Sequence, residues 1–223
     1  MTDDTGKAGL HPYALLTPDE VISAVESTGR ISDARILALN SYENRVYQFV
    51  AEDKKRYVAK FYRPQRWLPE QIQEEHDFSI ELTNHEIPVV APLVLNEQSL
   101  QQFQGFHFAL FPSVGGRQFE VDNLDHLEWM GRFIGRIHKV AKSHAFAHRP
   151  TISTEEYLHN PLLTLQNSEL IPSSLHQAFF TILEQVSDLA GSMYLNSNNI
   201  RLHGDCHPGN ILWRDGPTFV DLD

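Results

Sequence analysis

The spacing of hydrophobic and polar positions predicts a β-rich first half of the chain. Three apolar runs, ILAL (36–39), RVYQFV (45–50) and RYVAKFY (56–62), are separated by short polar stretches. Short strands joined by polar turns are typical of an antiparallel meander. The runs IPVVAPLVL (87–95) and FHFALF (106–111) are two further strand candidates. The first half is therefore expected to form an antiparallel sheet.

Two helices are predicted within this half. Thr17 stands directly before a Pro-Asp-Glu segment, which is a typical helix start, and this helix should run to about Gly29. The segment 69–85 begins with a proline, which suits a first helical turn, and has apolar residues at helical spacing. Its apolar stripe consists of Ile72, Phe78 and Leu82. The residues before the first helix, about 1–11, are expected to form a mobile tail.

The second half of the chain has a helical pattern. Residues 124–141 and about 175–194 have helical periodicity, and a polar, proline-containing region covers about 144–174. A linker between the two halves is indicated by Pro112, Gly115 and Gly116, because proline and glycine interrupt regular secondary structure. The expected class is α+β.

A small hairpin is predicted near the end of the sequence. The strand candidates IRLHGD (200–205), ILW (211–213) and TFVDLD (218–223) surround the loop CHPGN and the turn RDGP. Asp-Gly between apolar runs is a strong hairpin signal. This hairpin should carry the end of the chain back to the loop that precedes it.

Composition narrows the protein class. The 223 residues are 41% hydrophobic and 21% charged, which is typical of a globular protein with a substantial core. A net charge of −11 disfavours sequence-independent nucleic-acid binding, which needs basic patches. Cys206 is the single cysteine, so no disulfide framework exists. Since no signal peptide or membrane span is visible either, a cytoplasmic location is expected.

Three oxygen-bearing side chains form the central chemical candidate. Asp205 should end one strand, Asn210 should begin the next, and the hairpin should return Asp221 to the same edge. Carboxylate and amide oxygens suit Mg²⁺, and a carboxylate that does not bind metal can accept a proton from an attacking hydroxyl. The competing interpretation is that Asp205 and Asn210 merely cap a turn.

Lys60 is the second candidate, because it lies within an apolar strand. Such a lysine must either reach solvent at a sheet edge or find an anion. Glu75 lies on the apolar stripe of the 69–85 helix and also needs a partner, so pairing it with Lys60 satisfies both. Glu74 is the alternative partner.

These motifs together resemble the protein kinase fold in its aminoglycoside/choline phosphotransferase-like branch. Protein kinases have H-R-D-x-x-x-x-N and D-F-G where this chain has HGDCHPGN and DLD. From about residue 11 to its end the sequence resembles the bacterial stress response kinase A family. The strings that carry this resemblance are LNSYENRVYQF, VAKFYRPQRW, EEHDF, FPSVGGRQFE, HRPTI and LHGDCHPGNILWRDGPTFVDLD.

The resemblance implies a bilobal fold, with residues 1–112 as an ATP-binding lobe that has one main helix and 113–223 as part of a helical catalytic lobe. It implies a serine/threonine protein kinase that uses ATP and Mg²⁺, phosphorylates itself and acts in stress responses. A monomer with protein substrates is expected, and neither nucleic acid nor membrane is expected as a partner.

The resemblance also assigns roles to single residues. Asp205 becomes the catalytic proton acceptor, and Asn210 and the catalytic Asp221 become the Mg²⁺ ligands. Lys60 contacts the α- and β-phosphates and pairs with Glu75. The remaining cofactor-binding positions are Ser41 at the phosphates and the backbone around Phe111, Ser113 and Val114 at the adenine.

Two departures from the kinase pattern are visible. The loop NSYEN (40–44) has no glycine, although glycines let a backbone approach phosphates closely. The Ser41 hydroxyl and nearby N–H groups are expected to compensate. The sequence also ends at Asp223, before the further helices that this branch usually has, so we expect an N-terminal fragment.

Other side chains around the motif have more than one interpretation. His203 is expected to brace the loop through hydrogen bonds, and Cys206 to be buried packing. His207 either approaches the γ-phosphate or has a plain structural role.

Alternative functions remain open. A small-molecule kinase for an aminoglycoside, choline or homoserine-like hydroxyl would use the same Asp205. A hydrolase could bind a metal directly through His203, Asp205 and His207, although Pro208-Gly209 indicates a loop there. An inactive nucleotide-binding module is the third possibility.

Overall fold

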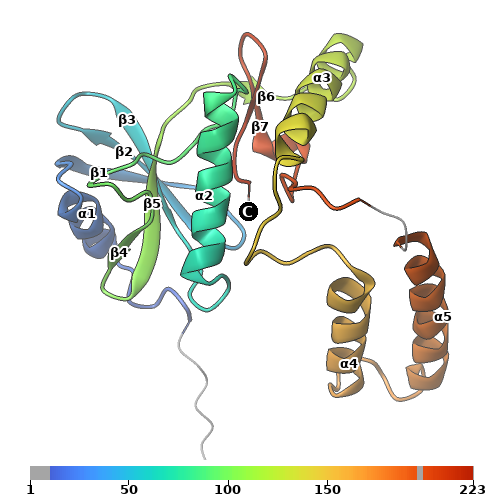
Figure 1. Cartoon of the computed structure of the whole chain (residues 1–223). Helices are drawn as coiled ribbons and strands as arrows, with labels where there is room; N and C mark the ends of the chain where they lie inside the picture. The colour runs from blue at the N-terminus through green and yellow to red at the C-terminus, as the bar shows by residue number, and fades with distance from the viewer. Residues whose placement is uncertain (1–10, 195–197, 223) are drawn as a thin grey trace, which may run out of the picture. The chain divides into compact units, whose positions relative to one another are not determined.

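The structure, a computed structural model, describes residues 11–194 and 198–222 (Figure 1). The predicted N-terminal tail therefore falls almost entirely outside the described residues. The chain divides into two compact units, one up to Val140 together with the segment from Leu202, and the other spanning Ala141–Arg201. The boundary at 112/113, which separates two functional lobes, stays a prediction.

A five-stranded antiparallel sheet forms the centre of the first unit, in the order β1-β2-β3-β5-β4. Its strands are β1 (Ser32–Leu39), β2 (Arg45–Ala51), β3 (Arg56–Phe61), β4 (Gln101–Phe103) and β5 (Phe106–Pro112). The predicted meander of three strands is confirmed. Opposite residues on β2 and β3, such as Val46 and Lys60, share one face of the sheet.

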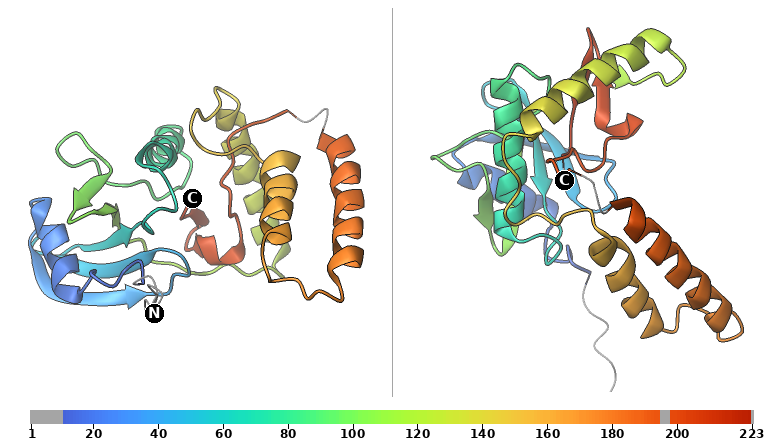
Figure 2. Two further views of the ribbon diagram at one scale, coloured as in Figure 1. Left: turned by 90° about the horizontal axis from the view of Figure 1, so that it is seen from below. Right: turned by 45° about the vertical axis from the view of Figure 1, so that its right-hand side comes forward.

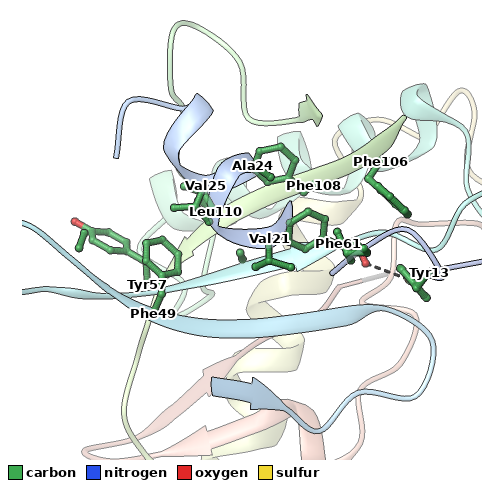
Figure 3. Close-up of a cluster of buried hydrophobic side chains, with 13 residues drawn as sticks. Tyr13, Val21, Ala24, Val25, Phe49, Tyr57, Phe61, Phe106, Phe108 and Leu110 are labelled. Carbon is green, nitrogen blue, oxygen red and sulfur yellow. Dashed lines mark hydrogen bonds between the residues drawn. The ribbon is translucent and has the colours of Figure 1, made fainter. Parts of the chain in front are cut away.

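One face of this sheet packs against helix α1 (Pro18–Ser27). Because strand side chains alternate, every second residue of β3 points to this face. The core there contains Val21, Ala24 and Val25 of α1 with Phe49, Tyr57, Ala59, Phe61, Phe106, Phe108 and Leu110 of the strands (Figure 3). Thr17 caps α1 as predicted, and its hydroxyl accepts the N–H of Glu20 at 3.3 Å.

The opposite face packs against helix α2 (Pro69–Asn84). Ile72 of α2 joins a buried cluster with Tyr62 and Ala109, and Figures 1 and 2 show α2 lying across this face of the sheet. The predicted stripe is confirmed, since Ile72, Phe78 and Leu82 are buried. Glu75 is buried on the same stripe.

The strand predicted over 87–95 is wrong. Pro88 and Pro92 lack the N–H groups that a strand ladder uses, and only isolated bridges form in this segment, at Val89 and Leu95. Strand β4 was not predicted, because Gln101–Phe103 is short and mostly polar. The helix and strand candidates at 69–85 and 106–111 are confirmed.

A second, three-stranded sheet has the order β6-β7-β8. It contains β6 (Arg117–Gln118), β7 (Ile211–Trp213) and β8 (Pro217–Phe219), so the predicted hairpin is confirmed while IRLHGD forms no strand. The linker at 112–119 ends the first sheet and also supplies β6. Gly116 is required there, since a Cβ would lie 2.9 Å from the Cβ of Leu212.

Helix α3 (Leu124–Ala141) lies beside this second sheet (Figures 1 and 2). The ring of His126 stacks on Trp213 with 3.7 Å between centroids, and Trp129 meets the same indole edge-on. Arg136 donates hydrogen bonds to the carbonyls of His85 and Glu86, at the C-terminal end of α2. The predicted 124–141 helix is therefore confirmed and is anchored to both neighbours.

The second unit is helical. It contains a π-helical turn at Glu155–His159, α4 (Asn160–Gln166) and α5 (His176–Tyr194). The helix expected at about 175–194 is confirmed. The helix within the polar 144–174 region was not predicted, although Pro161 lies in its first turn, where proline is tolerated. No helix among the described residues is long and apolar enough to span a bilayer.

Candidate functional site

A cavity of about 1100 Å³ lies within the first unit, on the face of the large sheet opposite α1. The side chains of Val46, Gln48, Val58 and Lys60 form its strand wall. The other walls come from α2, from the loop 40–44, from 111–114 and from the segments around 204–210 and 220–222. Every candidate site residue from the sequence lines this cavity, namely Ser41, Lys60, Glu75, Phe111, Ser113, Val114, Asp205, Asn210 and Asp221.

Lys60 lies between two carboxylates. Its ammonium is 3.7 Å from Oε1 of Glu75 and 2.5 Å from Oδ1 of Asp221. The Lys60 and Glu75 side chains are only 6% and 4% exposed, so this is a buried ion pair. The structure therefore brings Lys60 and Glu75 together. The Asp221 partner was not anticipated, because 161 residues separate it from Lys60.

The loop 203–210 positions Asp205 through Asn210. The Asn210 side-chain amide donates to the Asp205 backbone carbonyl at 3.0 Å and lies 3.4 Å from Oδ2 of its carboxylate. The sequence suggested that Asp205 ends a strand, but residues 200–207 are not in a strand. The loop is instead closed by a 3-10 turn over Pro208–Asn210.

His207 has a structural contact in this turn. Its Nδ1 accepts the N–H of Gly209 at 2.9 Å, and its Nε2 is 3.5 Å from Oδ2 of Asp205. A Cβ on residue 209 would lie 2.5 Å from the His207 ring, which explains the glycine there. These contacts favour the structural role among the two interpretations of His207.

The β7–β8 hairpin returns Asp221 to the loop. Val220 donates its N–H to the carbonyl of Asn210 at 3.0 Å. Phe219 is held on its other side by the segment after α2, through hydrogen bonds with Pro88 and Val90. Asp221 itself has φ of 62°, a left-handed conformation that costs free energy and is concentrated at functional positions.

The loop 40–44 is held without glycine. Tyr13 donates its hydroxyl to the carbonyls of Glu43 and Phe61, at 3.1 and 3.2 Å. Arg66 donates to the Glu43 carboxylate at 2.6 Å. Ser41 is partly exposed beside the cavity, where its hydroxyl can face a ligand.

Gln48 is a wall residue that sequence reasoning missed. It is a polar residue in the middle of the apolar run RVYQFV, and its side-chain amide donates to the Ser113 hydroxyl at 2.7 Å. It thereby ties β2 to the segment that contains Ser113. The signal was available, since Gln48 shares the strand face of Val46 and the paired Lys60.

Two further side chains near the motif differ in exposure. His203 is buried and its ring lies 6.2 Å from that of Phe219. Hydrogen bonds through which His203 braces the loop stay a prediction. Cys206 was expected to be buried, but it is exposed, because the loop is not part of a strand. Partial burial of the thiol and the neighbouring Asp205 carboxylate both raise the pKa of Cys206.

The cavity offers oxygen donors for a hard cation. Asn210 and Asp221 each present a side-chain oxygen group to it, and Asp205 presents a third. Among the described residues no cluster of three His, Cys, Asp or Glu side chains forms a ready-made metal site. A site with one carboxylate and one amide fits Mg²⁺, which usually takes its remaining ligands from phosphate and water.

Comparisons with known proteins agree with this geometry. Residues 35–223 match the phosphotransferase enzyme family. The chain is 50% identical over 212 residues to stress response kinase A of Escherichia coli K12, and 49% identical over 215 residues to serine/threonine protein kinase RdoA of Salmonella typhimurium. These matches cover 95% of this chain but 65% of each relative, so the chain spans about two thirds of their length.

Solved structures share the fold. An amicoumacin kinase in complex with AMP-PNP, Ca²⁺ and Ami superposes with a TM-score of 0.73 at 20% identity, over 96% of this chain and 66% of that one. A microcompartment-associated aminopropanol kinase superposes with a TM-score of 0.71 at 18% identity, over 91% and 69% of the two chains. The kinase-like fold expected from the sequence is confirmed.

Proposed function

This chain belongs to the phosphotransferase enzyme family, and from that premise we propose that it carries out ATP-dependent phosphoryl transfer to a Ser or Thr hydroxyl of a protein. The observation that carries the proposal is the convergence of Lys60, Asp205, Asn210 and Asp221 on one cavity. The names of relatives at about 50% identity favour a protein acceptor and a role in stress responses.

The donor nucleotide is assigned to the cavity between the large sheet and the 204–222 segment. Phe111, Ser113 and Val114 supply the wall for the adenine, and Ser41 with its loop covers the phosphates. Lys60 neutralises phosphate charge while Glu75 keeps its ammonium in place. Phosphoryl transfer depends mainly on such alignment and charge stabilisation.

Asp205 is assigned as the proton acceptor. Its side chain is 62% exposed at the cavity, and the Asn210 side-chain amide holds its backbone carbonyl by a hydrogen bond. A hydroxyl that hydrogen-bonds to the Asp205 carboxylate can transfer its proton there as the oxygen attacks the γ-phosphorus of ATP, whose bond to the bridging oxygen breaks to release ADP. A Mg²⁺ ion held by Asn210 and Asp221 would neutralise charge on the phosphate oxygens. Asp221 would then exchange its contact with Lys60 for one with the cation.

The test is the Asp205→Asn variant with labelled ATP. Since general base catalysis contributes about 10²–10⁴-fold, transfer should fall by that factor while ATP binding is largely kept. Asp215→Asn is the matched control, because Asp215 is a fully exposed acid in the adjacent turn and does not line the cavity. Equal loss in both variants, or full transfer by Asp205→Asn, would contradict the assignment.

A small-molecule acceptor is the alternative. Label on Ser or Thr of the chain itself or of an added protein supports the proposal. Label that appears only on an added aminoglycoside or amino alcohol supports a small-molecule kinase. ATP binding without any transfer corresponds to an inactive nucleotide-binding module.

A further inference from the structure

A buried network of hydrogen-bonded side chains lies beside the Lys60–Glu75 pair without including it. The Tyr62 hydroxyl is 2.7 Å from Nε2 of His76, and Nδ1 of His76 is 2.9 Å from the Ser99 hydroxyl. Gln73 extends this network, because its side-chain amide donates to the Ser99 hydroxyl at 3.0 Å. Tyr62 and His76 are 2% and 0% exposed, so both belong to the interior.

This hydrogen-bond network forms a second link between the large sheet and α2. Tyr62 directly follows β3 and lies two residues beyond Lys60, on the same face of the sheet. His76 directly follows Glu75 in α2. The Tyr62–His76 hydrogen bond therefore joins the residue that follows β3 to α2, next to the Lys60–Glu75 ion pair, which joins β3 itself to α2.

The aromatic rings of this pair contact both sides of the candidate nucleotide site. The Lys60 ammonium lies 4.9 Å from the centre of the Tyr62 ring, within the range of a cation–π contact. The His76 ring meets Phe111 edge-on at 6.2 Å. Lys60 and Phe111 line the cavity, whereas Tyr62 and His76 do not.

We propose that Tyr62 and His76 are positioning residues, which hold the Lys60 ammonium and the Phe111 ring in the geometry that receives the nucleotide. The Tyr62 ring contacts the ammonium, and the hydrogen bond to His76 holds that ring against α2. The ammonium has Asp221 at 2.5 Å, a contact that the proposed function gives up to the cation, and Glu75 at 3.7 Å, which is long for a hydrogen bond. The Tyr62–His76 link adds a further contact that limits how the lysine side chain turns.

This inference rests on the proposed function only where it concerns the nucleotide, so the test has two readouts. The first is the rate at which an amine-reactive acetylating reagent modifies Lys60, followed by peptide mass spectrometry with the exposed Lys54 and Lys139 as internal references. The second is the dissociation constant for ATP with Mg²⁺. The first does not depend on any activity of the chain.

Tyr62→Phe keeps the ring and removes the hydroxyl. It should raise Lys60 acetylation at least threefold relative to the references and weaken ATP binding three- to tenfold. Tyr57→Phe is the matched control, since Tyr57 is a buried β3 tyrosine whose hydroxyl also makes a 2.7 Å hydrogen bond, to Asp53, away from Lys60. That variant should change neither readout. His76→Gln, which removes the imidazole, should reproduce the Tyr62→Phe result from the other side.

A double-mutant cycle separates positioning from general packing. If Tyr62 acts mainly through Lys60, the effect of Tyr62→Phe on ATP binding should be much smaller in a Lys60→Ala background. An unchanged Lys60 acetylation rate in folded Tyr62→Phe and His76→Gln, an equal effect of Tyr57→Phe, or full additivity with Lys60→Ala would overturn the proposal. Failure of the parent chain to bind ATP would instead overturn the proposed function, and the acetylation result would still decide whether the link positions Lys60.

Discussion

Lys60 places a buried ammonium between the carboxylates of Glu75 and Asp221. A lysine within an apolar strand is stable only when its charge is compensated, and that requirement made the Glu75 pairing predictable from sequence. The Asp221 contact was not predictable in the same way, because it depends on how the hairpin packs 161 residues later. Local chemistry thus identified one partner, and tertiary packing supplied the other.

The Glu75→Gln substitution tests the energetic weight of this buried charge. Removing one partner of a buried ion pair typically costs about 3–5 kcal/mol, and because the Asp221 contact remains, the expected loss of unfolding free energy is about 3 kcal/mol. Urea denaturation measures it. Glu128→Gln is the control, because Glu128 and Arg132 form an exposed pair on α3 whose loss should cost less than ~0.5 kcal/mol. Similar losses in both variants would show that the Lys60–Glu75 pair is not specially stabilising.

Cys206 offers a pH-dependent test of the loop. Because its pKa is raised, first by partial burial and second by the Asp205 carboxylate, less thiolate is present at a given pH than in an unperturbed cysteine. Alkylation by iodoacetamide at pH 8 should therefore be slower than that of a model peptide thiol, although the residue is exposed. The rate should continue to rise at higher pH.

Asp205→Asn isolates the charge in this effect. It removes the carboxylate that favours the neutral thiol, so the midpoint of the alkylation profile should move to lower pH while staying above that of the peptide. A midpoint that does not move would show that the Asp205 carboxylate does not act on this thiol.

At the scale of elements, local pattern predicted most of the first unit. The strands at 36–62 and the helix at 69–85 follow from alternation and helical spacing, which are local properties of the chain. The segment 87–95 has the right hydrophobicity but two prolines, and the Pro88 carbonyl and the Val90 N–H bond to Phe219 of a distant strand instead. That contact positions the hairpin and hence Asp221, and no local sequence pattern predicts it.

Helix α1 depends on its N-terminal cap. Thr17→Ala removes the acceptor for the Glu20 N–H and should cost about 1 kcal/mol of unfolding free energy, whereas Thr17→Ser keeps the acceptor and should cost little. Chemical denaturation of the two variants measures the difference. Because loss of the cap makes α1, which covers one face of the sheet, easier to open, amides of α1 should also exchange faster with solvent in Thr17→Ala. Equal stability of the Ala and Ser variants would mean that the cap is not used.

At the scale of the whole molecule, the two compact units differ in their interiors. The first contains the large sheet, the core clusters on its α1 and α2 faces, and every residue of the candidate site. Among the described residues of Ala141–Arg201, few side chains are buried, namely those of Ala141, Phe180, Ser187 and Arg201. Several large apolar side chains of α4 and α5 are exposed instead, including Leu163, Ile182, Leu189 and Met193. The sequence pattern predicted helices here, but helical spacing alone does not say how much apolar surface becomes buried.

This difference predicts two levels of local stability. Segments with little buried apolar area open at lower free energy than a well-packed core. Amides of α4 and α5 should therefore exchange with solvent at least tenfold faster than those of β2, β3 and β5, as measured by hydrogen–deuterium exchange with mass spectrometry. Adding ATP and Mg²⁺ should slow exchange in β3 and around 204–212, where the candidate site lies, and leave α4 unchanged. Equal protection of the two units without ligand would show that the chain opens as a single cooperative structure, and protection confined to α4 and α5 on adding ATP would place the nucleotide outside the cavity assigned to it.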